Sequence, residues 1–134
     1  MAYWRSLLVW LLLMLIESIH GTLRLLLLVP IVGDFMARQI AVFTGALLIF
    51  ITTYFCISWI HPQRKSRSLL IGLLWVILTI LFEVLLGILV FRMSVSRIAE
   101  DYDILNGGLI PIGLLLMLFT PLAVAHIKGI KLKW

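Results

Sequence analysis

The sequence predicts an all-α integral membrane protein, built as a bundle of four transmembrane helices. Of the 134 residues, 63% are hydrophobic and only 13% are charged, which is far from the composition of soluble domains. Four apolar stretches also reach or approach the roughly 20 residues that a helix needs to cross about 30 Å of hydrocarbon. Because lipid offers no partner to backbone polar groups, these stretches are expected to be helices rather than strands. They are 7–28, 40–60, 69–91 and 109–127.

The connections between the predicted helices are short. They comprise residues 29–39, 61–68 and 92–108, which leaves no room for a soluble domain. We therefore expect one transmembrane domain over residues 1–134. Pro111 fits the first turn of the fourth helix, whereas Pro121 is expected to kink it, because proline lacks the amide that an interior turn uses.

Acidic and basic residues are expected at opposite ends of the four helices. The acidic residues are Glu17, Asp34, Glu83, Glu100, Asp101 and Asp103. The ends without acidic residues carry Arg5, Arg64, Lys65, Arg67, Lys128, Lys131 and Lys133. Since Lys and Arg gather on the cytoplasmic side of membrane proteins, both termini and the second connection are expected there. The location that fits is the bacterial inner membrane.

The net charge of +5 is interpreted as this orientation signal, together with contact to anionic lipid headgroups. No basic stripe extends beyond the membrane boundary, so nucleic-acid binding is not predicted. Membrane lipids are the expected partners, with a homo-oligomer or a larger membrane complex as further possibilities.

The sequence also suggests an internal repeat. The tetrapeptide RSLL begins at Arg5 and again at Arg67. Each copy continues to a glutamate that is followed four residues later by glycine, and these pairs are Glu17 with Gly21 and Glu83 with Gly87. The pattern predicts two parallel-repeated helical hairpins, related by an axis along the membrane normal. The alternative is that leucine-rich helices resemble one another by composition alone.

Four ionisable residues inside the apolar stretches predict a buried polar site. Glu17, His20 and Arg24 share one face of the first helix by their spacing. A carboxylate facing lipid would be costly, so Glu17 and Glu83 are both expected to face the bundle interior, with Arg24 paired to one of them. Gly72 on the third helix would allow a neighbouring helix to approach closely. The alternative is an ion-paired clasp that only fixes helix packing.

A second set of polar residues is predicted at the outer boundary of the membrane. Asp34 is expected to cap a helix beginning near Phe35, and Arg38 to snorkel toward water. The acidic residues around Tyr102 have oxygen ligands for a hard cation but lack an EF-hand spacing, which favours solvated charges. The set comprises Asp34, Arg38, Gln39, Arg92, Arg97, Asp101 and Asp103.

No metal site, cofactor or catalytic residue is predicted. Glu17 and His20 form one Glu-x-x-His pair, but di-iron bundles need a second pair, and Leu86 stands where the repeat would require its histidine. His61 and His126 lie at the inner ends of helices, where haem ligation is less common than contact with headgroups. Serine-histidine-aspartate order and phosphate-binding glycine loops are both missing from the sequence.

The chain size, the four helices and Glu17 resemble the small multidrug resistance transporters. Arg24, Glu83 and the acidic stretch 101–103 depart from the pattern of that family. We expect a small transporter or channel-like protein with an outward-facing buried polar site. The alternatives are an accessory subunit of a larger membrane complex and a membrane-embedded enzyme acting on a lipid or quinone-like molecule.

Overall fold

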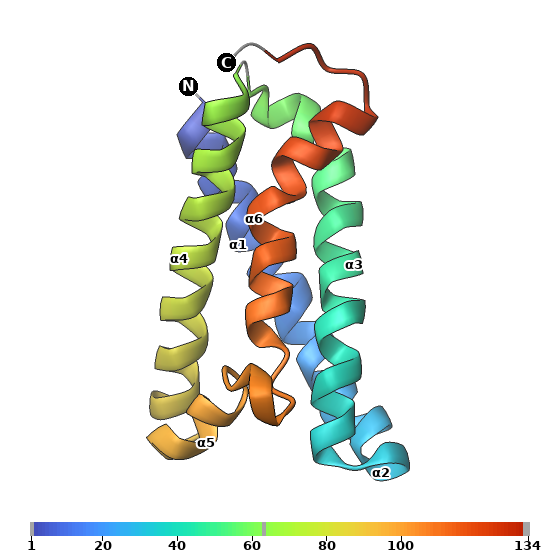
Figure 1. Ribbon diagram of the computed structural model, residues 1–134, viewed down its shortest axis with the longest axis vertical. Coiled ribbons are helices and arrows are strands. Elements are labelled where there is room, and N and C mark those ends of the chain that lie inside the picture. Colours follow the sequence, from blue (N-terminus) through green and yellow to red (C-terminus); the bar gives the residue numbers. More distant parts are fainter. Residues whose placement is uncertain (1, 63, 133–134) are drawn as a thin grey trace.

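The computed structural model describes residues 2–62 and 64–132, most of which lie in helices (Figure 1). Four helical segments are long and apolar enough to cross a membrane, which confirms the predicted all-helical class. They are Tyr3–Val32, Asp34–Ile60, Lys65–Leu89 and Ile110–Ile127. Lys133, one of the residues assigned to the basic end, lies outside the described residues.

The first membrane segment is longer than predicted and contains a wide turn. It comprises α1 (Ala2–Leu23), the π-helical segment η1 (Arg24–Leu28) and α2 (Val29–Val32). The Val29 amide bonds to the Arg24 carbonyl, five residues back rather than four. Pro30 follows directly, and a proline ring clashes with the carbonyl four residues before it. The wider turn relieves this clash and lets the helix continue to Val32.

The first connection is reduced to a single residue, so its predicted extent of 29–39 is wrong. Gly33 has a φ of +88°, a backbone conformation open to glycine, and α3 (Asp34–Ile60) begins immediately after it. Gly33 therefore occupies the N-cap position predicted for Asp34, and no side chain caps this helix. The Asp34 carboxylate instead lies 3.0 Å from Nε of Arg38.

The third connection has structure of its own. Between α4 (Lys65–Leu89) and α6 (Ile110–Ile127) lie the short helix α5 (Val95–Glu100) and the 3-10 turn η2 (Ile104–Asn106). Ser94 caps α5 by accepting a hydrogen bond from the Arg97 amide. The connection therefore folds back over the end of the bundle instead of forming an open loop (Figure 1).

The prolines of α6 occupy the predicted places. Pro111 lies in the first turn, where its missing amide costs no helical hydrogen bond. Pro121 lies in the interior, and Figure 1 shows α6 bending in the half toward its C-terminal end. Beside it, the Thr120 hydroxyl donates to the Leu116 carbonyl at 2.5 Å.

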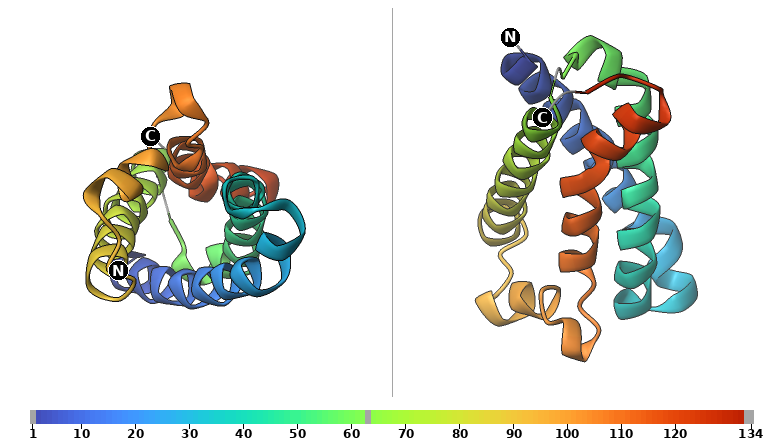
Figure 2. Two further views of the ribbon diagram at one scale, coloured as in Figure 1. Left: turned by 90° about the horizontal axis from the view of Figure 1, so that it is seen from below. Right: turned by 45° about the horizontal axis from the view of Figure 1, so that its top comes forward.

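The four long helices surround a common axis in the order α1, α3, α6, α4 (Figure 2). α1 is inclined, so that it lies beside α4 near the N-terminus and beside α3 at its other end (Figure 1). Two hydrogen bonds join α1 to α4 near the N-terminal end. Trp75 Nε1 donates to the Ser6 carbonyl at 2.9 Å, and Trp10 Nε1 donates to Thr79 Oγ1 at 3.0 Å.

The packed core lies in the half of the bundle that carries both chain termini. Its fully buried side chains come from all four helices and include Leu13, Ile57, Ile71, Trp75 and Val124. The helices α4 and α6 approach closely at Gly72, where an added Cβ would lie 2.0 Å from the Leu118 carbonyl oxygen. This contact confirms the predicted role of Gly72 in close helix packing.

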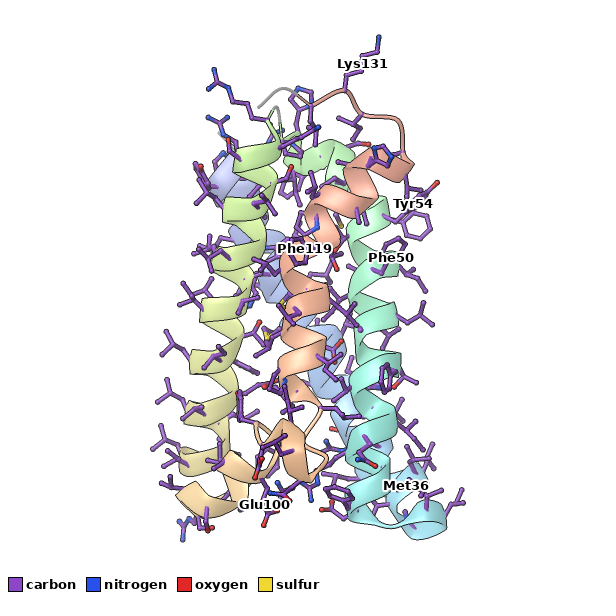
Figure 3. The ribbon with its side chains drawn as sticks, in the orientation of Figure 1. Met36, Phe50, Tyr54, Glu100, Phe119 and Lys131 are labelled. Atoms are coloured by element: carbon purple, nitrogen blue, oxygen red, sulfur yellow. The ribbon has the colours of Figure 1, made fainter. Side chains whose placement is uncertain are left out.

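Opposite charges mark the two ends of the bundle (Figure 3). Lys131 lies at the end with the chain termini and the 61–64 connection, which we call the basic end. Glu100 lies at the other end, with Gly33 and the 90–109 connection, which we call the acidic end. Aromatic rings accompany the basic charges, with the Arg5 guanidinium 5.3 Å from the ring centre of Trp4.

Candidate functional site

A cavity of about 490 Å³ lies within the half of the bundle nearer the acidic end. All four residues predicted for the buried polar site line it: Glu17, His20, Arg24 and Glu83. The cavity was expected between the first and third membrane helices, but α3, α6 and the 90–109 connection also contribute to its wall.

Toward the basic end the cavity stops near the middle of the bundle. Its lining residues at that level are Met14, Ile49, Thr79 and Met117, which are buried. Beyond them lie the fully buried side chains of the core and the hydrogen bond between Trp10 and Thr79. The site therefore connects with the acidic half of the molecule only.

Glu17 is held on α1 with its carboxylate against α3. A Cβ atom added to Gly45 would lie 2.8 Å from Glu17 Oε2, so a side chain at position 45 would force the carboxylate to shift. Glu17 Oε2 lies 3.5 Å from His20 Nδ1, one helical turn away. Glu17 Oε1 is buried and has no hydrogen-bond partner.

His20 connects the cavity with the surface of α3. Its Nε2 lies 2.6 Å from Oγ1 of Thr44, and the Thr44 residue is exposed on the outside of the bundle. Glu17, His20 and Thr44 thus form a chain of carboxylate, imidazole and hydroxyl groups. Such a chain can carry or orient a proton between the cavity and the α1–α3 boundary.

Arg24 does not form the ion pair that the sequence predicts. Within the described residues, no carboxylate oxygen lies within 4.0 Å of its guanidinium, and its buried Nε has no hydrogen-bond partner. Arg24 begins the π-helical segment η1 and lines the cavity. π-helical turns occur frequently at functional sites. The half-buried Arg24 side chain therefore lacks the carboxylate partner that an ion-paired clasp requires.

Glu83 lies on α4 and lines the same cavity as Glu17. Glu83 remains accessible because the cavity is open beside it, and no described residue donates a hydrogen bond to it.

Arg38 is the centre of an ion-pair network at the acidic end. Its guanidinium contacts Asp101, lies 3.0 Å from Asp34 and lies 3.9 Å from Glu100. Only 11% of the Arg38 side chain is exposed, so the prediction that it snorkels to water is wrong. Arg97 extends the network, with 3.1 Å to Asp101.

The predicted outer-boundary set is divided by the structure. Arg38, Gln39 and Asp101 line the cavity. Gln39 also donates to the Gly107 carbonyl at 2.9 Å, so α3 and the 90–109 connection are joined there. The remaining members lie outside the lining, and they are Asp34, Arg92, Arg97 and Asp103. Asp103 instead accepts a hydrogen bond from Asn106 Nδ2 at 2.6 Å.

Tyr102 is a lining residue that the sequence analysis did not assign to the site. Its hydroxyl is buried without a hydrogen-bond partner. Burial, and then the charges of Glu83 and Asp101, raise its pKa to about 12. Gly45 and Thr44 were also missed, although a polar and a small residue together in an apolar stretch gave a signal for both.

Comparison with protein-family models, with curated proteins and with solved structures gives no match for this chain. Function is therefore argued from the site, and a helical bundle alone does not specify one.

The cavity wall offers an unpaired acceptor, an unpaired donor and a hydroxyl. They belong to Glu17 Oε1, Arg24 Nε and Tyr102. Buried polar atoms in folded proteins normally have hydrogen-bond partners, and exceptions concentrate at functional positions. A molecule bearing both N–H donors and acceptor oxygens would satisfy all three. In the described part of the chain, no group of three or more His, Cys, Asp or Glu residues is arranged to hold a metal ion.

Proposed function

We propose that this chain is a small membrane transporter that binds a proton or a cargo with a cationic group in the cavity. The observation that supports this most strongly is the position of Glu17 and Glu83, two carboxylates from different membrane helices that open into one cavity. Ionisable residues inside transmembrane segments typically mark ion and substrate pathways. The packed core between the cavity and the basic end corresponds to the closed side of such a carrier.

We also propose an orientation and a cellular location. The basic end faces the cytoplasm, with both termini, and the acidic end faces the periplasm of a bacterial inner membrane. The cavity then opens outward. The two parallel-repeated hairpins of the sequence pattern belong to this proposal, because α1 and α4 would each begin in the cytoplasm and bring one glutamate to the site.

The residues at the site have separate roles in this proposal. Glu17 and Glu83 bind the proton or cation, and His20 passes protons between Glu17 and Thr44. Arg24 holds an acceptor group of the cargo, since its Nε has no hydrogen-bond partner among the described residues. Release on the other side requires α1 and α4 to separate where Trp10 donates to Thr79.

Flux measurements in proteoliposomes test the proposal. We would record proton flux with a trapped pH-sensitive dye and the uptake of ethidium as a cationic probe. Glu17→Gln and Glu83→Gln should each lower flux by about tenfold or more, because each removes a charge that the cargo needs. Glu100→Gln serves as the control, since 59% of the Glu100 side chain is exposed and the residue lies outside the cavity lining.

If both cavity variants retain the flux of the unmodified protein, the transporter proposal is wrong. Stoichiometric co-purification with other membrane proteins, combined with unchanged flux, would instead favour an accessory subunit of a larger complex.

A further inference from the structure

We infer that the cavity binds an amphiphile with a phosphoethanolamine-type head, an aminophospholipid that enters sideways from the outer leaflet between α1 and α4. This inference rests on the proposed function and specifies the class of cargo. It combines a lateral opening of the cavity with the chemistry of its unpaired atoms.

The first step concerns the side of α1 that faces the cavity. Ser18, Thr22 and Leu25 line the cavity, yet all three residues are exposed. Glu17 and His20, by contrast, are directed toward α3, through Gly45 and Thr44. Because residues on a helix are spaced by about 100°, Ser18 and Thr22 are rotated away from α3. The cavity therefore continues to the outer surface of the bundle along the side of α1 that faces away from α3.

The second step concerns the helix across this opening. On α4, Phe82 and Leu86 line the cavity. Phe82 makes an edge-to-face contact with Trp10, whose ring centre is 6.0 Å away, and this contact bounds the opening toward the basic end. Between this contact and the acidic end, α1 turns away from α4 and toward α3 (Figure 1). The gap therefore has apolar rings and aliphatic side chains on one flank and two hydroxyl-bearing residues on the other.

The third step concerns the head of the ligand. Glu17 Oε1 needs a donor, and Arg24 Nε needs an acceptor. A primary ammonium group supplies three N–H donors, and a phosphate supplies acceptor oxygens that match a guanidinium. A quaternary ammonium has no N–H to donate, and an anionic lipid without an amine offers Glu17 at most a neutral hydroxyl, which bonds a carboxylate less strongly than an ammonium does. The two unpaired atoms together therefore select a head that carries both groups.

The order of the groups along α1 fits a head that enters amine-first. Arg24 lies two turns nearer the acidic end than Glu17, about 10 Å along the helix at 1.5 Å per residue. Long helical side chains lean toward the N-terminus of their helix, which brings the Arg24 guanidinium closer to Glu17 and shortens the interval that the head has to bridge. The ammonium then lies at Glu17 and the phosphate at Arg24, with the acyl chains leaving past Ser18 and Thr22. The volume of about 490 Å³ exceeds what the head alone would fill and accommodates the upper part of the chains.

Native mass spectrometry of the detergent-solubilised protein tests the inference directly. Phosphatidylethanolamine, phosphatidylcholine and phosphatidylglycerol of identical acyl chains would be titrated one at a time. We expect phosphatidylethanolamine to bind about tenfold or more tighter than the other two, equivalent to about 1.4 kcal/mol. Glu17→Gln and Arg24→Gln should each remove this preference. Excess glycerophosphoethanolamine, the same head without acyl chains, distinguishes a site for the free head from a site for the lipid. It should displace the bound phosphatidylethanolamine only if the site needs no acyl chain.

The lateral route has its own matched pair of variants. Ser18→Trp places a bulky ring in the gap and should abolish the binding of phosphatidylethanolamine. Ile19→Trp places the same ring on an exposed position outside the cavity lining and should leave binding unchanged.

Equal binding of all three lipids, or equal binding by both tryptophan variants, would overturn the inference. Flux of ethidium or protons without any lipid preference would overturn the lipid inference and leave the transporter proposal intact. Selective binding of phosphatidylethanolamine without any flux would overturn the transporter proposal and leave the lipid inference intact.

Discussion

The Glu17 carboxylate lies against the backbone of Gly45, and a Cβ on Gly45 would come within 2.8 Å of Oε2. Gly45→Ala should therefore displace the carboxylate from its position without unfolding the bundle, because the group in contact is the free end of a flexible side chain. We expect flux in proteoliposomes to fall several-fold while the melting temperature in detergent changes little. Gly21→Ala is the control, since nothing lies within 4 Å of its added Cβ. Equal flux in the two variants would show that the position of Glu17 is unimportant.

At Gly72, where α4 packs closely on α6, an alanine is expected to lower the stability of the bundle. A Cβ on Gly72 would lie 2.0 Å from the Leu118 carbonyl oxygen, and a backbone atom cannot swing aside. Gly72→Ala should thus lower stability by about 1–3 kcal/mol, the usual cost of overpacking. Gly87→Ala, on the same helix, meets the flexible side chains of Ile98 at 3.2 Å and Met93 at 3.7 Å and should cost less. Thermal unfolding in one detergent compares the two, and a Gly87→Ala variant as unstable as Gly72→Ala would contradict the prediction.

The boundary between α1 and α4 can be measured as a pairwise interaction. Trp10 Nε1 donates to Thr79 Oγ1 at 3.0 Å, where the cavity ends and the core begins. A double-mutant cycle with Trp10→Phe and Thr79→Val should give a coupling of about 0.6 kcal/mol, the average for hydrogen bonds between membrane helices, and at most about 1.7 kcal/mol. Unfolding by denaturing detergent supplies the four free energies. A coupling of zero would mean that this bond does not hold the two helices together.

The sequence predicted the membrane class because that class follows from length and hydropathy alone. The sequence also indicated that Glu17, His20, Arg24 and Glu83 belong together, and all four line one cavity. Each is costly in lipid, and the helical repeat fixes which face each one occupies. Helix ends were predicted less well. Gly33 makes a turn of one residue, and Pro30 is accommodated by a π-helical turn that no propensity or hydropathy scale describes.

Partners across helices were beyond the sequence for a related reason. Arg24 was expected to pair with a glutamate because opposite charges attract, but pairing depends on the relative depth of α1 and α4. That depth is set by the Trp10–Thr79 hydrogen bond and its neighbour, which no spacing within one helix reveals. Tyr102 was missed similarly, since its place in the cavity depends on how the 90–109 connection folds back.

The ion-pair network at the acidic end should keep this connection in place. Asp101 contacts both Arg38 and Arg97, whereas Asp103 accepts a hydrogen bond only within its own turn. We expect Asp101→Asn to raise amide hydrogen exchange in α5 several-fold, because both guanidinium groups lose a charged partner. Asp103→Asn should leave exchange in α5 unchanged. Exchange in α5 that is the same in both variants would show that the network does not hold the connection.

The buried Tyr102 hydroxyl should make the stability of the fold depend on pH in the alkaline range. Burial, followed by the charges of Glu83 and Asp101, raises its pKa to about 12, above the ordinary tyrosine value of 10.0. Since the folded-state pKa is the higher one, the protonated hydroxyl supports the fold fully below pH 10, and this contribution is lost as the pH rises through about 12. The difference in absorbance at the tyrosinate band between the unmodified protein and Tyr102→Phe should therefore have its midpoint near pH 12. Tyr102→Phe should also unfold less steeply than the unmodified protein as the pH is raised from 10 to 12. A midpoint near 10, with parallel unfolding of the two proteins, would place the Tyr102 hydroxyl in water rather than in the wall of the cavity.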